Sequence, residues 1–215
     1  MKVKLISLTK PFIEGIETAE ELISYCARVS NPSNQLNTET APRLLKYCID
    51  HQHWSIYEQA FMTVEVKTSR AIAAQILRHR SFSFQEYSQR YSKATTLENL
   101  EWRLQGKTNR QGGDEEYPIS QNMDVAVIVH EAQQKCLKAY EKLIESGIAK
   151  ECARMVLPLN TSTTLYMSGS IRSFIHYLQL RTKEDTQKEH RDIALEIKKI
   201  FVKEFPATSC ALNWL

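Results

Sequence analysis

The stretch SRAIAAQILRHRSFSFQEYSQRY, residues 69–91, decides how the rest of this 215-residue sequence is interpreted. Its first half is apolar almost all the way round and predicts a buried helix over Ser69–Arg80. Gln75, Arg78 and His79 interrupt the apolar residues at spacings of three and four, which places them on one face of that helix. A polar stripe on a buried helix needs partners, either from the protein or from a ligand.

The second half of the stretch combines cations with aromatic side chains. Three arginines bracket a segment that carries Glu86, Ser88 and three aromatic rings. Guanidinium groups stack on planar rings and bind phosphate through paired hydrogen bonds, so the pattern suits a planar anionic ligand such as a nucleotide. A salt-bridged Arg/Glu turn on the surface explains the same spacing about as well.

Two further arginines lie in apolar surroundings. Arg181 continues an apolar stripe at positions i, i+3, i+4 and i+7 of the helix predicted over Ser170–Arg181. A core-facing arginine is costly unless an anion or an electron-rich group meets it. The alternative is a helix-end arginine that reaches toward solvent and satisfies the last carbonyls. Arg154, in KECARMVLP, has the same two interpretations.

The remaining sequence favours an α+β fold. Residues Ser92–Gln121 are polar and are expected to form a long loop. Periodicity and capping signals predict strands at Lys2–Leu8, Ala60–Val66 and Thr163–Met167, and helices from Thr18 to near Ser30 and at Glu39–His51, Asp124–Ser146, Lys150–Leu157 and Gln187–Phe205. Because there is no repeat, linker or low-complexity tract, residues 1–215 are expected to form a single helix-rich domain around a small, mostly antiparallel sheet.

Composition excludes several classes of protein. A net charge of +3 is too weak to indicate a nucleic-acid coat or a membrane surface. The five cysteines show no metal-ligand spacing and their odd number fits no complete disulfide framework. Because no signal peptide or membrane-length apolar run is present, the expected location is the reducing cytoplasm. His51 and His53 have no third ligand nearby, so no metal site is expected.

Several segments together resemble the flavin-dependent thymidylate synthase family. Arg-His-Arg at 78–80, then seven residues, then Ser88 is similar to the family's signature. HWSIYEQAFMTVEV, residues 53–66, resembles its His-x-Ser/Thr-x-x-Glu followed by a strand, and residues 149–159 and the Arg181 helix follow in the family's order. The resemblance implies an enzyme that methylates dUMP to dTMP using FAD, with methylenetetrahydrofolate as carbon donor and NADPH as reductant. It also implies a homotetramer with shared active sites.

The resemblance assigns roles to individual residues. FAD contacts are expected from Ser55, Arg78, His79, Arg80, Glu86, Ser170, Ile171, Arg172 and His176. Contacts to dUMP are expected from Gln75, Arg78, Glu86, Tyr87, Ser88, Gln89, Arg90, Arg154 and Arg181, with the phosphate near Ser88, Arg90 and Arg154. Arg181 is expected to meet the uracil ring and favour its ionised form. His53 is expected to lie over the flavin near the folate entrance, and with Arg181 it forms the catalytic pair.

Other function classes explain only parts of the pattern. The thymidylate synthases that use a cysteine nucleophile place it after a proline, and no cysteine here follows one. Ser88 lies in no Gly-x-Ser-x-Gly turn, which argues against a hydrolase. A nucleic-acid-binding module would use the arginines and aromatic rings but leaves Arg154 and Arg181 unexplained. A catalytically silent nucleotide sensor would bind dUMP without flavin turnover. Both of these rivals predict a colourless protein, whereas oxidised flavin is yellow.

Overall fold

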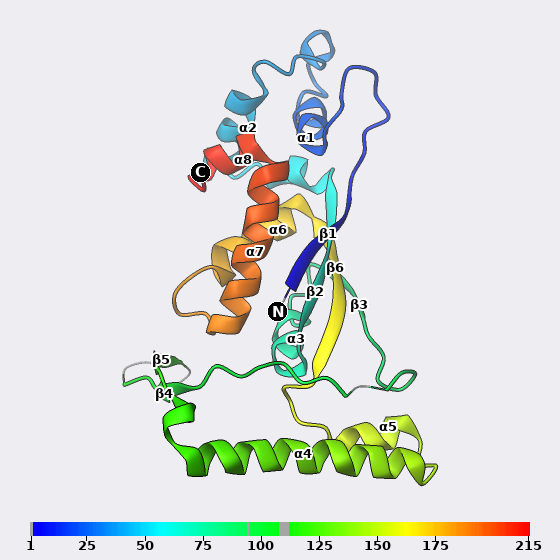
Figure 1. The fold of residues 1–215 in the computed structure, drawn as a ribbon. Coiled ribbons are helices and arrows are strands. Elements are labelled where there is room, and N and C mark those ends of the chain that lie inside the picture. Colours follow the sequence, from blue (N-terminus) through cyan, green and yellow to red (C-terminus); the bar gives the residue numbers. More distant parts are fainter. Residues whose placement is uncertain (1, 94, 108–111) are drawn as a thin grey trace.

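The structure, a computed structural model, describes residues 2–93, 95–107 and 112–215 and is drawn in Figure 1. Its strands are β1 (Lys2–Leu8), β2 (Phe61–Ser69), β3 (Ser83–Glu86), β4 (Arg103–Gln105), β5 (Gly113–Glu116) and β6 (Ser162–Ser170). Its α-helices are α1 (Ala19–Ala27), α2 (Ala41–Asp50), α3 (Arg70–Ile76), α4 (Met123–Glu145), α5 (Lys150–Ala153), α6 (Ile171–Arg181), α7 (Lys188–Glu204) and α8 (Pro206–Ala211). Short 3-10 turns are η1 (Pro32–Asn34), η2 (Trp54–Glu58), η3 (Ile119–Gln121) and η4 (Arg154–Val156).

A four-stranded antiparallel sheet forms the centre of the fold, with strand order β1-β2-β6-β3. The two central strands, β2 and β6, pair over nine residues, from Phe61 opposite Ser170 to Ser69 opposite Ser162. β4 and β5 form a separate antiparallel pair. The predicted α+β class, helix-rich around a small antiparallel sheet, is therefore confirmed.

The helices cover one face of this sheet. The alternating apolar side chains of β2 and β6 are fully buried and belong to one core cluster with residues of α3, α6 and α7. Figure 1 shows α6 and α7 stacked on that side of the strands. The intervening side chains, such as Thr63, Glu65 and Tyr166, are only half-buried or exposed. One layer of helices on a two-faced sheet explains why the strands alternate in polarity.

Local signals set the ends of several helices. Thr18 and Glu21 form the predicted capping box at the start of α1. At the end of α4, Gly147 takes a positive φ of 80°. The amide of Gly147 then bonds the carbonyl of Ile144, and that of Ile148 bonds Leu143. This Schellman arrangement satisfies the last carbonyls of the helix, as its glycine predicts.

Each central strand ends in a serine that caps the next helix. Ser69 Oγ accepts from the Ile72 amide at 3.4 Å, and Ser170 Oγ accepts from the Ser173 amide at 3.3 Å. Because β2 and β6 are antiparallel, α3 and α6 begin at opposite ends of the strand pair. They run back over the covered face in opposite directions, so the chain just after α3 reaches the second half of α6.

Three expectations about the elements are corrected. The helix predicted over Ser69–Arg80 ends at Ile76, because the chain must turn to let β3 pair with β6. It is also not buried all round, since Ala74 and Leu77 are exposed. The stretch 92–121, expected as a loop, contains β4, β5 and η3, although residues 94 and 108–111 lie outside the described part. β3 and α8 were not predicted at all.

Helix α4 stands apart from the layered core. Figure 1 shows it lying across one end of the sheet, next to α5. Tyr140 is the one buried residue recorded on it, while Met123, Val127 and Ile128 are exposed. Of the helices that the structure describes, α4 included, none has both the length and the apolar character needed to cross a bilayer.

Candidate active site

Arg181 and His79 join the end of α6 to the turn after α3. Arg181 Nε donates a hydrogen bond to His79 Nε2 at 2.9 Å, across 102 positions of sequence. Both side chains are half-buried. Of the two interpretations of Arg181, the structure therefore favours an electron-rich partner over the capping of helix carbonyls. The Nη groups of Arg181 have no partner in the described part of the chain, which leaves them available to a ligand.

The charge of this pair resides on Arg181. Burial and the nearby Arg181 guanidinium lower the pKa of His79 below its ordinary value. The imidazole is therefore neutral near pH 7, and its Nε2 lone pair can accept from the arginine. A fixed cation in a partly desolvated position stabilises negative charge that develops on a bound ligand.

A hydrogen-bonded group behind the pair includes residues that sequence reasoning missed. His190 of α7, fully buried, lies 3.1 Å from Tyr177 Oη through Nε2 and 3.3 Å from Gln75 Oε1 through Nδ1. The amide of Gln75 also donates to Gln187 Oε1 at 2.6 Å. A signal for His190 was present, because it begins the apolar stripe that Ile193, Ala194 and Ile197 continue along α7.

A second group lies where β3 ends. Glu86 Oε1 accepts from Arg70 Nη1 at 2.8 Å and from Thr163 Oγ1 at 2.9 Å. The cation that pairs with Glu86 is Arg70 of α3, which lies outside residues 78–91. Glu86 is therefore not part of a salt-bridged turn within that segment, the alternative interpretation of its spacing. Tyr87 donates from its hydroxyl to the Lys93 carbonyl at 2.8 Å, and Ser88 is exposed.

Gln89 differs from its neighbours in this second group. Only 5% of the residue is exposed, and its Nε2 is buried without a hydrogen-bond partner among the described residues. An orphaned buried donor is costly unless an acceptor occupies the space beside it.

Basic side chains surround the same turn. Arg90 Nε lies 3.2 Å from Glu151 Oε2, with both side chains more than half exposed. Arg154 is half-buried in η4, and its side chain has no partner among the residues that the structure describes. Lys150 donates to the Tyr91 carbonyl at 2.7 Å. An exposed ion pair contributes little to stability, so Arg90 can exchange Glu151 for a stronger anion.

A third group gathers around η2 and the start of α6. His53 and Ser55 are exposed, and His176 packs edge-on against Trp54 with ring centroids 4.9 Å apart. Burial and the nearby Arg172 lower the pKa of His176. Arg172 donates to Glu58 at 2.6 Å. Ser170 and Ile171 are buried at the first turn of α6.

One chain does not bring these three groups into a single pocket. The first group consists of Gln75, His79 and Arg181. Glu86 of the second group lies opposite Leu165 on β6, which is five positions before Ser170 of the third group. At about 3.3 Å per residue, the second and third groups are roughly 17 Å apart along the strand. Arg78 and Arg80 are exposed and have no ion-pair partner in the described ranges.

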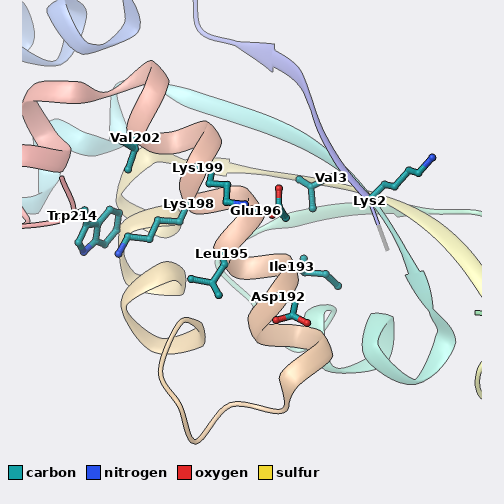
Figure 2. Close-up of a pocket in the computed structure, with 10 residues that line it drawn as sticks. All are labelled: Lys2, Val3, Asp192, Ile193, Leu195, Glu196, Lys198, Lys199, Val202 and Trp214. Carbon is teal, nitrogen blue, oxygen red and sulfur yellow. Dashed lines mark hydrogen bonds and ion pairs between the residues drawn. The ribbon is translucent and has the colours of Figure 1, made fainter. Parts of the chain in front are cut away.

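Two cavities in the described part of the chain are lined by other residues. One of about 670 Å³, shown in Figure 2, lies between β1, α7 and the C-terminal Trp214. Lys198 Nζ lies 4.8 Å from the centroid of the Trp214 ring. Another cavity, of about 350 Å³, lies between α4 and the start of α3. None of the predicted site residues lines either cavity.

Residues 12–207 match a family model described as thymidylate synthase complementing protein. The chain is 55% identical over 216 residues to a probable flavin-dependent thymidylate synthase of Paramecium bursaria Chlorella virus 1, covering 100% of both chains. It is 51% identical over 217 residues to the flavin-dependent thymidylate synthase of Synechocystis sp., again covering 100% of both. Among solved structures, the UMP/dUMP methylase PolB from Streptomyces cacaoi, bound with 5-Br dUMP, is similar with a TM-score of 0.82 and 26% identity. That match covers 99% of this chain and 94% of the other.

Proposed function

The chain belongs to the thymidylate synthase complementing protein family, the flavin-dependent thymidylate synthases, and from that premise we propose how its residues carry out the reaction. It is an FAD-dependent methyltransferase that converts dUMP to dTMP, the step that supplies dTMP for nucleotide biosynthesis. Methylenetetrahydrofolate donates the carbon and NADPH reduces the flavin. The enzyme acts in the cytoplasm as one catalytic domain over residues 1–215, a location supported by its five free cysteines.

The observation that carries this proposal is the half-buried Arg181 held by a neutral His79. The uracil ring is a weak acid whose anion has negative charge on its nitrogen and carbonyl oxygens. A cation that is already fixed in place stabilises that anion without reorganisation during the reaction. Arg181 therefore binds the ring and favours its ionised form, which is more electron-rich at carbon 5, the atom that receives the one-carbon unit.

The residues of the second group suit the rest of dUMP. Arg154 and the exchangeable Arg90 supply positive charge, Ser88 supplies an exposed hydroxyl, and the buried Nε2 of Gln89 supplies an unpaired donor. A phosphate accepts from the arginine and serine donors. Glu86 and Tyr87 complete the nucleotide set, with Gln75 of α3 and Arg78 of the turn that follows α3.

Two unpaired arginines and the α6 N-terminus fit a dinucleotide cofactor. Arg78 and Arg80 match the negative pyrophosphate of FAD, and the first turn of α6 adds its positive dipole end beside Ser170, Ile171 and Arg172. His79, Glu86, Ser55 and His176 complete the proposed contacts. When reduced, FAD supplies the hydride that the uracil ring accepts. His53, exposed beside η2, is proposed to border the folate entrance.

No protein nucleophile is needed in this reaction. Burial raises the pKa of the Cys26 and Cys48 thiols, so both remain protonated and unreactive near pH 7. The protein's contribution is to hold dUMP, to stabilise its ionised ring and to exclude water.

Assembly into a homotetramer with shared sites is also proposed. It is supported by the separation of the three groups within one chain and by the exposed apolar residues of α4. A partner subunit would bring its own copy of one group against another group of the first chain.

The purified protein provides the test. We expect it to be yellow, to release FAD on denaturation, and to form dTMP only when dUMP, methylenetetrahydrofolate and NADPH are all present. A colourless protein with steeply salt-dependent nucleic-acid binding would support the binding-module alternative instead. A protein that binds dUMP but leaves it unmethylated would support the sensor.

A further inference from the structure

The proposed reaction assigns no task to His190, although this residue is fully buried. Its ring lies between the Tyr177 hydroxyl, 3.1 Å from Nε2, and Gln75 Oε1, 3.3 Å from Nδ1. Burial, together with Arg181 and His79, lowers the pKa of His190 to about 3. The ring is therefore neutral and carries one N–H.

The direction of these hydrogen bonds follows from the carboxylate of Glu189, which lies at the far end of the hydrogen-bonded network from Tyr177. Glu189 can only accept, and it receives Gln187 Nε2 at 2.9 Å and the Arg103 guanidinium. Gln187 therefore turns its oxygen toward Gln75, which must donate through its own Nε2 at 2.6 Å. Gln75 Oε1 then faces His190, so the imidazole proton lies on Nδ1. Nε2 is left to accept from the Tyr177 hydroxyl, whose proton is retained because burial raises its pKa.

The hydrogen bonds that run from Glu189 through Gln187, Gln75 and His190 to Tyr177, here called the relay, fix the amide of Gln75 at both ends. One N–H of Gln75 is bound to Gln187, and its oxygen is bound by His190. The second N–H has no partner among the described residues, so Gln75 can present a donor to a ligand. Without the relay, the amide would rotate and present either a donor or an acceptor. The His190 ring also lies near the His79 ring, with their centroids 6.0 Å apart, and His79 is hydrogen-bonded to Arg181.

We propose that His190, supported by Tyr177 and Gln187, is a positioning residue that orients the Gln75 amide so that its free N–H binds an acceptor oxygen of dUMP. The inference rests on the proposed function, because it takes Gln75 to contact that nucleotide. It goes further in assigning a role to a buried residue that contacts no ligand itself. A packing role alone would need the volume of His190 but not its Nδ1 proton.

The test varies dUMP in steady-state dTMP formation by the flavin-loaded enzyme. His190→Leu keeps an apolar side chain of similar size and removes the donor. Loss of one oriented hydrogen bond should raise the KM for dUMP about tenfold, while kcat changes less than threefold. His190→Asn, whose side-chain NH₂ lies near the position of Nδ1, should return KM to within about threefold of the wild type. Ile197→Ala, in the same buried stripe, is the matched control and should lower stability without changing KM.

Three outcomes decide the inference. In a Gln75→Ala background, His190→Leu should add no further increase in KM, because the relay has lost its target. An increase of the same size in that background, or an Asn variant as impaired as the Leu variant, would overturn the proposal. If His190→Leu does not fold, the exposed Gln187 replaces it. Gln187→Ala should raise the KM for dUMP about threefold in the otherwise wild-type enzyme and leave it unchanged in the Gln75→Ala background. If Gln187→Ala changes the KM for dUMP in neither background, the inference is overturned.

Failure of the inference differs from failure of the proposed function. If the wild-type protein forms dTMP but Gln75→Ala leaves the KM for dUMP unchanged, only the positioning role is wrong. If the flavin-loaded wild type forms no dTMP, the proposed function is wrong.

Discussion

At the scale of single residues, the surroundings of each histidine set what it can do. His53 is exposed beside η2, His79 accepts from a guanidinium, and His190 is enclosed between a tyrosine and a glutamine. The rings of His79 and His190 are neutral, because desolvation and the charge of Arg181 both oppose protonation. In this group of side chains the positive charge therefore lies on Arg181 and not on the histidines, which gives a bound ring a fixed cation.

The first prediction concerns Arg181. Arg181→Ala should lower the rate of dTMP formation by about a hundredfold or more, equivalent to about 3 kcal/mol of transition-state stabilisation. The rate is measured at saturating dUMP, folate and NADPH, with flavin content checked by absorbance. Arg43→Ala, an exposed arginine on α2, is the matched control. Full activity of a flavin-loaded Arg181→Ala enzyme would remove this residue from the mechanism.

The second prediction concerns acid stability. The pKa of His190 is lowered from 6.5 to about 3 in the folded state, so below pH 6.5 the unfolded chain binds a proton that the folded chain rejects. Folding stability should therefore fall as pH decreases from about 6.5 toward 3, by about 1.4 kcal/mol per pH unit. His190→Asn lacks this contribution and should lose about 2 kcal/mol less between pH 7.5 and 5.

Urea unfolding at equal protein concentration measures this difference. The lowered pKa of His79 acts in the same direction, but His79 is present in both proteins and cancels from the comparison. Parallel loss of stability in the two proteins would show that His190 is not held neutral.

At the scale of elements, two strand–helix units build the first group of the site. β2 leads into α3 and β6 into α6, each through a serine cap, and the antiparallel pairing of the strands turns the two helices toward each other. Phe82, between α3 and β3, secures the intervening turn by packing edge-on against Phe174 of α6, with centroids 4.9 Å apart. The positions of Arg78 and Arg80 therefore depend on the packing of the Phe82 ring.

The third prediction concerns the space beside that ring. Gly169 lies on β6 opposite Met62, and a Cβ added there would lie 2.5 Å from Cδ1 of Phe82. Gly169→Ala should therefore displace Phe82 and lower stability by about 1–3 kcal/mol, measured by thermal unfolding. Flavin affinity should fall as well, because the adjacent turn carries the proposed cofactor contacts.

A double-mutant comparison controls this prediction. In a Phe82→Leu background the smaller side chain makes room, so the same alanine should cost distinctly less. Equal costs in the two backgrounds would mean that the clash is relieved elsewhere.

At the scale of the whole molecule, a single chain leaves two surfaces uncovered. Among the helices that the structure describes, none covers the second face of the central sheet, and α4 exposes 66% of Ile128 and 46% of Val127. A 23-residue helix with so little of its apolar surface buried is unusual for an isolated chain. Subunit contacts would cover this surface and bring separate groups of the proposed site together.

The fourth prediction follows from that surface. The wild-type protein should scatter light as about four chain masses at working concentration, whereas Ile128→Glu should dissociate because a buried unpaired charge is costly. Flavin content and dTMP formation should fall together with dissociation. Gln134→Glu, exposed on the same helix, controls for added charge. A wild-type protein that forms dTMP as a monomer would contradict the proposal that the active sites are shared between subunits.

Much of the fold could be predicted from the sequence because it depends on local interactions. The capping box of α1, the glycine end of α4 and the periodicity of α6 and α7 are all properties of residues close in sequence. β1 was predicted from its alternating pattern, although it forms by pairing with β2 about 60 positions away. The chemistry of the site was also visible, since a guanidinium on an apolar stripe requires an electron-rich partner wherever it lies. The pattern alone left Arg181 with two interpretations, and the family resemblance assigned it to the uracil ring.

Only the tertiary structure decided who that partner is. β3 was not predicted because it is a four-residue edge strand that forms only by pairing with β6, about 80 positions away in sequence. The same pairing ends α3 early and brings His79 to Arg181, while the packing of α7 brings His190 to Gln75. The sequence by itself determined which side chains need partners, because that need is intrinsic to each side chain. The tertiary structure decided which partners they have, because contacts between distant residues depend on how the whole chain packs.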